Sequence, residues 1–414
     1  MFVYVLNKHG RPIMPCQPRK ARLLLKSGKA KVVRRTPFTI QLLYGSSGYV
    51  QPVSFGVDAG SKTIGLSAAT ETRVLFEGEV RLRTDIVDLL STRREFRRAR
   101  RNRKTRYRQA RFLNRKRSDG WVAPSVENKI QTHIKAVKLV HSILPINKLT
   151  VEVAQFDIQK IKNQDIQGEE YQRGDQLGFW NVREYVLWRD NHTCRHCHGK
   201  SKDPRLNVHH IESRKTGGCA PNNLITLCET CHNKHHKGEI IVHVKRGQAF
   251  RDAAFMGIMR WTFYNRLKAD CPNVGLTYGY LTKNTRIQAG LDKAHGVDAR
   301  CINGNPQAQA GDTQYLLRQV RGQNRQLHKA TIRKGGIRQK NKAPKYVHDY
   351  RLFDKVMFEG RECFVFGRRS KGYFDLRLLD GTKVHASVTV KKLRLLERSK
   401  TLLIERRQAI SSPL

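Results

Sequence analysis

The chain has few acidic residues and no long apolar run. Its 414 residues include 34 aspartates and glutamates against 80 lysines and arginines, which gives a formal net charge of +46. A chain with this charge repels itself and is expected to bind a polyanion, of which nucleic acid is the natural candidate. It contains no signal-peptide or transit-peptide pattern and no apolar run near about eighteen residues, so secretion and membrane spanning are not expected.

The nine cysteines do not form a disulfide framework. Five of them are scattered without a pairing pattern, as expected in a reducing compartment: Cys16, Cys219, Cys271, Cys301 and Cys363. The other four form two Cys-x-x-Cys pairs with thirty residues between them: Cys194, Cys197, Cys228 and Cys231. Four thiolates suit a closed, tetrahedral zinc site that holds a small fold together.

Histidines gather around the cysteine pairs. Nine of the sixteen lie between positions 192 and 243, and the adjacent His209 and His210 stand between the two pairs. Asn223 precedes the second pair, while His232 and His236 are four residues apart, which places them on one face of a helix if that segment is helical. The alternative is a zinc ribbon that only binds nucleic acid, but such a module has no use for adjacent histidines and a positioned asparagine.

This segment resembles the HNH (ββα-metal) nuclease family in the order of its His-His, Asn-Leu and Cys-His elements. The resemblance implies that His210 is the general base that deprotonates a water, and that Asn223 orients this base. It also implies that one divalent cation, Mg²⁺ or Mn²⁺, binds to His209, His232 and His236. The spacing leaves open whether His235 replaces His236.

Three further acids lie in apolar or helical settings. Asp58 ends an apolar strand, Glu152 lies in the middle of a β-branched strand, and Asp298 follows His295 by three residues, one helical turn. A carboxylate in an apolar strand needs a metal or another cation beside it to offset its desolvation. For Asp58 the alternative is an Asx turn that caps the strand.

The ordered acids resemble the split RuvC nuclease, which has an RNase H-like fold. The resemblance implies that Asp58, Glu152 and Asp298 hold two Mg²⁺ or Mn²⁺ ions for in-line hydrolysis, with His295 helping to activate the nucleophile. The histidine-rich segment is then an insertion between the second and third RuvC segments.

A very basic stretch separates the first two acidic strands. Residues 93–117 contain fourteen arginines and lysines and one acid, and a thin apolar stripe at helical spacing predicts a long helix. A helix with charge on nearly every face needs phosphate on several sides; a disordered basic tail is the alternative. The candidate nucleic-acid contacts are Arg93, Arg94, Arg97, Arg98, Arg100, Arg101, Arg103, Lys104, Arg106, Arg108, Arg111 and Arg115.

Over essentially the full chain, the order of segments resembles the IscB family of transposon-associated, RNA-guided nucleases, with Pro-Ile-Met-Pro at 12–15 where that family has PLMP. We expect an α/β multidomain protein: an RNase H-like (RuvC) core split into three segments, an inserted ββα-metal HNH domain with structural zinc, an arginine-rich bridge helix and a small C-terminal β-barrel-like domain. The predicted divisions are 1–52 (PLMP), 53–92 (RuvC I), 93–120 (bridge helix), 121–178 (RuvC II and linker), 179–245 (HNH), 246–311 (RuvC III) and 312–414 (guide-RNA and target-adjacent-motif interaction).

The resemblance implies a guide RNA (ωRNA) that pairs with double-stranded target DNA, with HNH cutting the guide-paired strand and RuvC the displaced strand. It implies a monomer in a ribonucleoprotein, in a prokaryotic cytoplasm and on the nucleoid when bound to DNA, with no membrane partner. One alternative is an unguided HNH endonuclease of the restriction or homing type, which leaves the acids and the basic helix unexplained. Another is a non-catalytic RNA-binding transposition accessory protein, which the intact candidate residues argue against.

Overall fold

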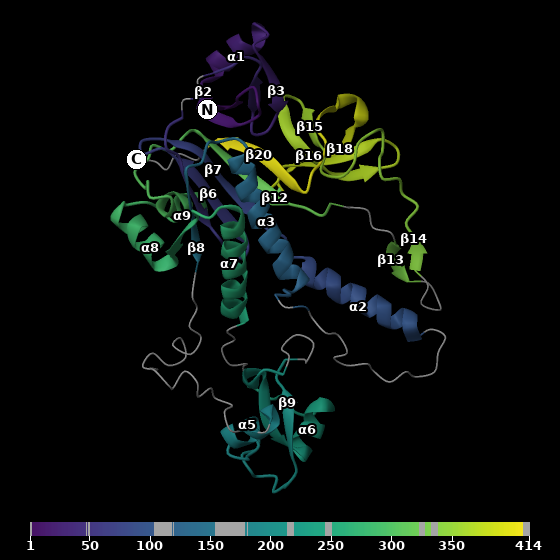
Figure 1. Cartoon of the computed structure of the whole chain (residues 1–414). Helices are drawn as coiled ribbons and strands as arrows, with labels where there is room; N and C mark the ends of the chain where they lie inside the picture. The colour runs from purple at the N-terminus through teal and green to yellow at the C-terminus, as the bar shows by residue number, and fades with distance from the viewer. Residues whose placement is uncertain are drawn as a thin grey trace. The chain divides into compact units, whose positions relative to one another are not determined.

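A computed structural model describes residues 2–46, 48, 50–102, 118, 120–153, 179, 181–212, 219–244, 251–322, 328–332 and 338–408 (Figure 1). The chain divides into two compact units, a larger one formed by 1–154 and 258–414 and a smaller one formed by 155–257. The smaller unit is therefore an insertion in the sequence of the larger one. No helix of the described residues is long and apolar enough to cross a membrane.

The larger unit is built on a seven-stranded sheet with the order β11-β8-β5-β6-β7-β12-β20. Strands β5 (Ser54–Asp58), β6 (Thr63–Ala69) and β7 (Val74–Arg81) form an antiparallel meander. Strand β8 (Lys148–Val153) pairs parallel with β5, and β11 (Gly275–Tyr278) pairs parallel with β8 at the sheet edge. Strands β5 and β8 are buried along most of their length, which explains their continuous apolar sequence.

One face of this sheet carries α9 (His295–Ile302), and α8 (Gly279–Gln288) packs against α9. Helix α9 lies so close to β5 and β6 that only glycine fits beneath it. A Cβ added at Gly56 would lie 2.0 Å from the Ala299 carbonyl oxygen, and one at Gly65 would lie 1.9 Å from that of His295. The two glycines thus set the height of α9 above the strand that ends in Asp58.

The opposite face carries α3 (Pro124–His141), whose His141 ring lies 6.0 Å from the ring of Phe55 in β5. Helix α7 (Arg251–Asp270) packs against α3, where the rings of Phe263 and His133 are 5.0 Å apart. The apolar periodicity of both helices predicts this packing, because each buries one stripe against the sheet or its neighbour.

Two strands extend the sheet beyond the range predicted for it. Strand β12 (Thr313–Gln319) pairs parallel with β7, and β20 (Leu402–Gln408) pairs antiparallel with β12. Both lie in the range 312–414, which the sequence assigns to the C-terminal domain. Local pattern shows that a segment is a strand but not which distant strand it joins, so the predicted boundary after residue 311 cuts across the sheet.

The N-terminal residues form a four-stranded sheet of order β2-β1-β4-β3, covered by α1 (Pro18–Lys26). Its parallel central pair is β1 (Val3–Leu6) and β4 (Thr39–Leu42), flanked by β2 (Pro12–Cys16) and β3 (Ala30–Arg34). Strands β1 and β4 with α1 thus form a βαβ-like unit, with an antiparallel strand on each side.

The C-terminal region contains a five-stranded antiparallel sheet of order β18-β17-β16-β15-β19. Its strands are β15 (Lys355–Phe358), β16 (Arg361–Arg369), β17 (Tyr373–Arg377), β18 (Lys383–Thr389) and β19 (Arg394–Glu397). In the part of the chain that the structure describes, the outer strands β18 and β19 are not paired with each other.

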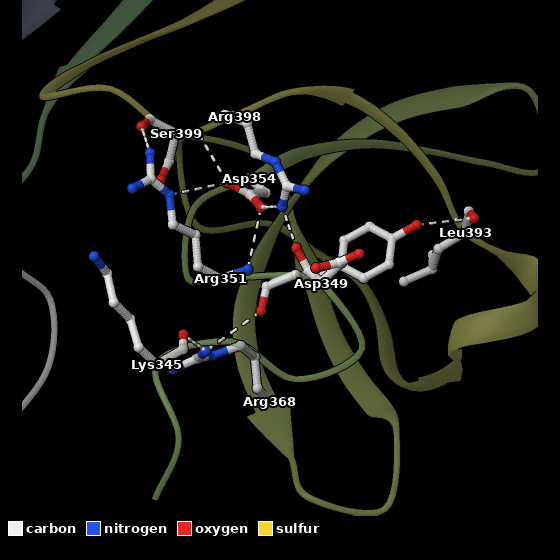
Figure 2. Close-up of polar contacts among 9 residues, drawn as sticks. Lys345, Asp349, Arg351, Asp354, Arg368, Leu393, Arg398 and Ser399 are labelled. Carbon is white, nitrogen blue, oxygen red and sulfur yellow. Dashed lines mark hydrogen bonds and ion pairs between the residues drawn. The ribbon is translucent and has the colours of Figure 1, made fainter.

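A buried carboxylate organises the loop that precedes β15. Figure 2 shows Asp354 between the guanidinium groups of Arg351 and Arg398, and the Ser399 amide donates to Asp354 over 2.7 Å. Asp354 is fully buried, and such a charge is tolerated because it is paired and hydrogen-bonded on several sides. Arg368 donates to the Lys345 and Tyr350 carbonyls, which anchors the start of the same loop.

The predicted basic helix begins earlier than expected, as α2 (Ile86–Asn102). Arg93, Arg94, Arg97 and Arg98 are exposed on it, as a nucleic-acid-binding helix requires. The continuation over 103–117, with its six candidate contacts from Arg103 to Arg115, lies outside the described residues.

The smaller unit has a ββα arrangement. Strands β9 (Leu206–His210) and β10 (Leu224–Cys228) form an antiparallel pair, and α6 (Glu229–His236) follows β10 directly. Helix α5 (Val182–Arg189) packs on both strands. Among its described residues the buried apolar clusters are small: one consists of Ile225, Leu227, Cys194, Cys228 and Cys231, and the other of Tyr185, Val186 and Leu224. This unit therefore has little apolar surface with which to stabilise itself.

Candidate active sites

The four cysteines of the smaller unit converge on one point. Their sulfur atoms all lie within 4.8 Å of one another, and the Sγ atoms of Cys197 and Cys228 are 3.8 Å apart. A tetrahedral zinc with Zn–S bonds of about 2.3 Å separates its sulfur ligands by about 3.8 Å. The donor set and its spacing therefore fit a structural zinc ion.

A hydroxyl group not predicted from the sequence supports these thiols. Ser201 Oγ lies 3.3 Å from Cys197 Sγ and 3.1 Å from Cys228 Sγ. Burial opposes ionisation of Cys197, but hydrogen bonds from Ser201 and Cys194 outweigh it and bring the pKa of Cys197 down to about 6. A thiolate is the form that binds zinc, so Ser201 favours the metal-ready state of the cluster.

Three histidines form a second cluster in the same unit. His209 ends β9, His232 and His236 lie on α6, and one ring nitrogen of each lies within 4.8 Å of the other two. The predicted helical spacing of His232 and His236 is confirmed, and their Nε2 atoms are 3.2 Å apart. His235 turns its Nδ1 to the Ile240 carbonyl oxygen, 3.3 Å away, so the geometry favours His236 as the third candidate ligand.

The charge state of these rings suits a metal. Burial, together with the neighbouring His235, His232 and His236, lowers the pKa of His209 to about 4, and burial also lowers the pKa of His232. Both rings are therefore neutral near pH 7, with a nitrogen lone pair available to a divalent cation.

Asn223 acts on the chain just beyond His210. It is fully buried, its Oδ1 accepts from the Glu212 amide at 2.9 Å, and its Nδ2 donates to the Glu212 carbonyl at 3.0 Å. Its own carbonyl accepts from Ile211 at 2.9 Å. Asn223 thus fixes the backbone on which His210 stands. The Nε2 of His210 lies 3.6 Å from Cys219 Sγ, a contact that the sequence pattern did not predict.

In the larger unit, strand register brings the predicted acids together. Val57 of β5 pairs with Val151 of β8, so Asp58 and Glu152 follow at the next position of adjacent parallel strands. His295, at the start of α9, places its Nδ1 2.8 Å from Asp58 Oδ2, and this contact raises the pKa of His295. Asp298 lies one turn further along α9.

The three carboxylates interact electrostatically. Burial raises the pKa of Glu152 and of Asp298, and the charge of Asp58 raises both further. Among the described residues only the cysteine and histidine clusters bring three ligand atoms within 4.8 Å, so the acids are spaced more widely than ligands of one ion.

Two arginines in this centre were not predicted. Arg260 of α7 places Nη1 3.0 Å from Glu152 Oε1 and donates from Nε to the Ala59 carbonyl at 2.8 Å. Arg286 of α8 places Nε 3.0 Å from Asp298 Oδ1. Arg260 is a charged residue within an apolar helical pattern, and that pattern by itself indicates only a core helix.

A fourth acid, Glu77, is buried under the first turn of α9. A Cβ added at Gly296 would lie 2.8 Å from Oε1 of Glu77, a residue of β7, and Gln314 donates to the same oxygen at 2.8 Å. Burial raises the pKa of Glu77. No sequence signal marked it, because β7 alternates glutamates with apolar residues as an exposed strand would.

Residues 3–174 match a family described as RRXRR protein, and residues 194–238 match the HNH endonuclease family. Anaredoxin from Nostoc sp. strain PCC 7120 is 42% identical over 43 residues, which are 10% of this chain and 57% of that protein.

Two solved structures are similar to parts of the chain. Streptococcus thermophilus Cas9 in complex with the GGAA PAM has a TM-score of 0.35 and 14% identity, over 52% of this chain and 30% of that one. The type II-C Cas9 from Actinomyces naeslundii has a TM-score of 0.25 and 12% identity, over 62% and 60%. The chain thus spans less than two thirds of each of these three relatives.

The HNH match covers both metal-ligand clusters of the smaller unit, and the RRXRR match covers the meander and α2. Residues 194–238 of the smaller unit are therefore similar to an HNH endonuclease domain.

Proposed function

We propose that this protein is an RNA-guided, double-stranded DNA endonuclease with two metal-dependent centres. The observation that carries the proposal is the presence of two chemically distinct clusters in two separate units, one of imidazoles and one of carboxylates. A duplex has two strands to cut, and one centre for each strand accounts for both clusters. An unguided HNH endonuclease needs only the first.

In the smaller unit, His210 accepts the proton of the attacking water, and Asn223 holds the backbone that positions it. His209, His232 and His236 would hold one Mg²⁺ or Mn²⁺ ion, which when bound polarises the scissile phosphate and stabilises the leaving oxygen. The cysteine cluster keeps β10 and α6, and hence the histidines, in place. We assign the guide-paired strand to this centre.

In the larger unit, Asp58, Glu152 and Asp298 would hold two Mg²⁺ or Mn²⁺ ions. His295 is held by Asp58 at the edge of the centre and accepts a proton as the nucleophile forms. We assign the displaced strand to this centre, and the backbone of a guide RNA to the exposed arginines of α2. The C-terminal domain, residues 312–414, is the proposed reader of a motif beside the target.

The experiment begins with the RNA that copurifies with the protein. Sequencing it should give one structured transcript, and the matching target, placed beside a randomised sequence in a plasmid library, should be cut. Removing the RNA should abolish cutting at that site. Cutting of the same site without RNA would favour an unguided HNH endonuclease.

The two centres are tested by single substitutions. His210→Ala should leave a nick only in the displaced strand, and Asp58→Ala only in the guide-paired strand. The matched controls are His243→Ala and Asp312→Ala, which remove exposed residues outside both centres and should leave both cuts. If either His210→Ala or Asp58→Ala abolishes both cuts, the assignment of one strand to each centre is wrong.

A further inference from the structure

The carboxylate centre already contains two cations of its own. Arg260 and Glu152 are 3.0 Å apart with both side chains about 10% exposed, and Arg286 and Asp298 are 3.0 Å apart at 15% and 16% exposure. Each arginine comes from a different helix and takes one of the outer acids. Asp58, which lies between them, is paired with His295 instead.

The two ion pairs differ in how firmly they are made. Arg260 is tied down twice, because its Nε also donates to the Ala59 carbonyl beside Asp58. Arg286 Nε and Asp298 Oδ1 are both buried, and neither makes a hydrogen bond although they are 3.0 Å apart. The Arg286–Asp298 contact is thus made by charge without directional bonding, while Arg286 Nη1 donates to the Leu291 carbonyl at 3.4 Å.

A divalent ion and a guanidinium cannot both neutralise the same carboxylate without repelling each other. In a partly buried site this repulsion is much stronger than in water, because the effective dielectric constant is lower. An entering phosphodiester changes the balance, since it adds negative charge and offers the arginines an acceptor that matches their planar fork.

We propose that Arg260 and Arg286 are internal counter-cations that compete with divalent metal for Glu152 and Asp298, so that the centre binds its metal tightly only when a nucleic-acid strand enters. This inference rests on the proposed function of the carboxylate centre. Because coupling between two ligands is reciprocal, bound strand raises metal affinity and bound metal raises strand affinity by the same factor. The free protein then avoids cutting DNA that it meets by chance through its positive charge.

The alternative role for the arginines, positioning the acids, predicts the opposite change in metal affinity. If they only hold the acids in position for the metal, removing one leaves a buried carboxylate misplaced, and metal binds more weakly. If they compete, removing one makes metal bind more tightly. The direction of the change therefore decides between the two roles.

The test is a Mn²⁺ titration of the full-length chain followed by electron paramagnetic resonance. It is made in a His232→Ala background, which removes one ligand of the histidine cluster, and is repeated with a single-stranded DNA oligonucleotide. In the absence of DNA, Arg286→Gln should bind Mn²⁺ about tenfold or more tightly than the parent, as expected for loss of a unit charge beside a divalent ion. The oligonucleotide should increase Mn²⁺ affinity strongly in the parent and little in Arg286→Gln.

Two variants serve as controls. Arg286→Lys keeps the charge and should keep the weak binding of the parent. Arg266→Gln removes an arginine from the same helix as Arg260. Arg266 lies away from the centre, where its Nη1 donates to Glu127 Oε1 at 2.7 Å, so this variant should leave the Mn²⁺ affinity unchanged. Arg260→Gln should act in the same direction as Arg286→Gln, with circular dichroism used to verify that each variant is folded.

Each outcome has a distinct meaning. Weaker Mn²⁺ binding in folded Arg286→Gln and Arg260→Gln overturns the competition. Binding that is unaffected by the oligonucleotide in the parent overturns the coupling. If Asp58→Ala removes none of the Mn²⁺ that the parent binds, with or without DNA, the carboxylate centre does not bind this metal. The proposed function of the centre then fails, and the inference fails with it.

Discussion

The imidazole cluster of the smaller unit and the carboxylate cluster of the larger one differ in how the chain builds them. The first uses a hairpin and one short helix, and all its candidate ligands lie between positions 209 and 236. The second draws on β5, β8 and α9, which the chain reaches in widely separated segments. A local site needs a metal to hold a small fold together, whereas a nonlocal site takes its rigidity from a large sheet.

The largest difference should appear when the zinc cluster is broken. Cys231→Ser should unfold the smaller unit, because structural zinc contributes on the order of 10 kcal/mol to folds whose core is this small. Zinc content should fall and residues 181–244 should become open to protease, while the displaced strand is still cut. Cys271→Ser, which changes a cysteine outside the cluster, should have neither effect. Protease resistance of the smaller unit in the absence of zinc would contradict the conclusion that a metal holds this unit together.

A substitution beneath α9 should destabilise the larger unit alone. Gly65→Ala puts a Cβ against the His295 carbonyl, so α9 must move off the sheet or the sheet must distort. Overpacking of this kind costs about 3 kcal/mol. We expect a lower thermal midpoint and loss of the displaced-strand cut, with the guide-paired cut intact. Gly45→Ala meets nothing within 4 Å and should leave both cuts unchanged; equal losses in the two variants would contradict the close approach of α9.

Acid should also destabilise the larger unit through His133. Burial lowers the pKa of this residue to about 4 from 6.5, so the unfolded chain binds a proton between these values and the folded chain does not. Stability is therefore present above pH 6.5 and is lost as pH falls towards 4, by about 2 kcal/mol at pH 5. Denaturant titrations at pH 7 and pH 5 should show this loss, and His133→Gln should remove it. The exposed His9→Gln should keep it; an unchanged slope in His133→Gln would assign the acid sensitivity to other groups.

The smallest effect concerns the support of the zinc cluster. Ser201→Ala removes the hydroxyl that contacts Cys197 and Cys228, and loss of such an outer contact typically weakens metal binding about tenfold. Zinc should pass to a chromophoric chelator faster, while the fold is retained. Thr193→Ala removes a hydroxyl of the same unit that donates to the Asn191 carbonyl, and serves as the control. Equal release rates would show that Ser201 does not contribute.

Much of the smaller unit could be predicted from its sequence. The two cysteine pairs indicate a zinc site, and a spacing of four residues predicts that His232 and His236 share a helix face. These relations hold within a single turn or hairpin, where sequence distance and spatial distance agree. The choice between His235 and His236 required the structure, because it depends on the acceptor that His235 finds at Ile240.

Less of the carboxylate centre in the larger unit could be predicted from the sequence. Its apolar strands and the acids within them are visible in the sequence, but Arg260, Arg286 and Glu77 are not marked as members of the centre. Their place depends on which helix packs on which face, and on the glycines that let α9 approach. The pairing of β12 and β20 with the large sheet was missed for the same reason.

The sequence by itself determined the metal-ligand clusters, the basic helix and the identity of the acids, because each depends on residue chemistry and short-range spacing. Only the tertiary structure decided which cations stand beside those acids and how closely α9 covers them. Such contacts join segments that are distant in the chain, and the partner of a buried charge depends on how those segments pack.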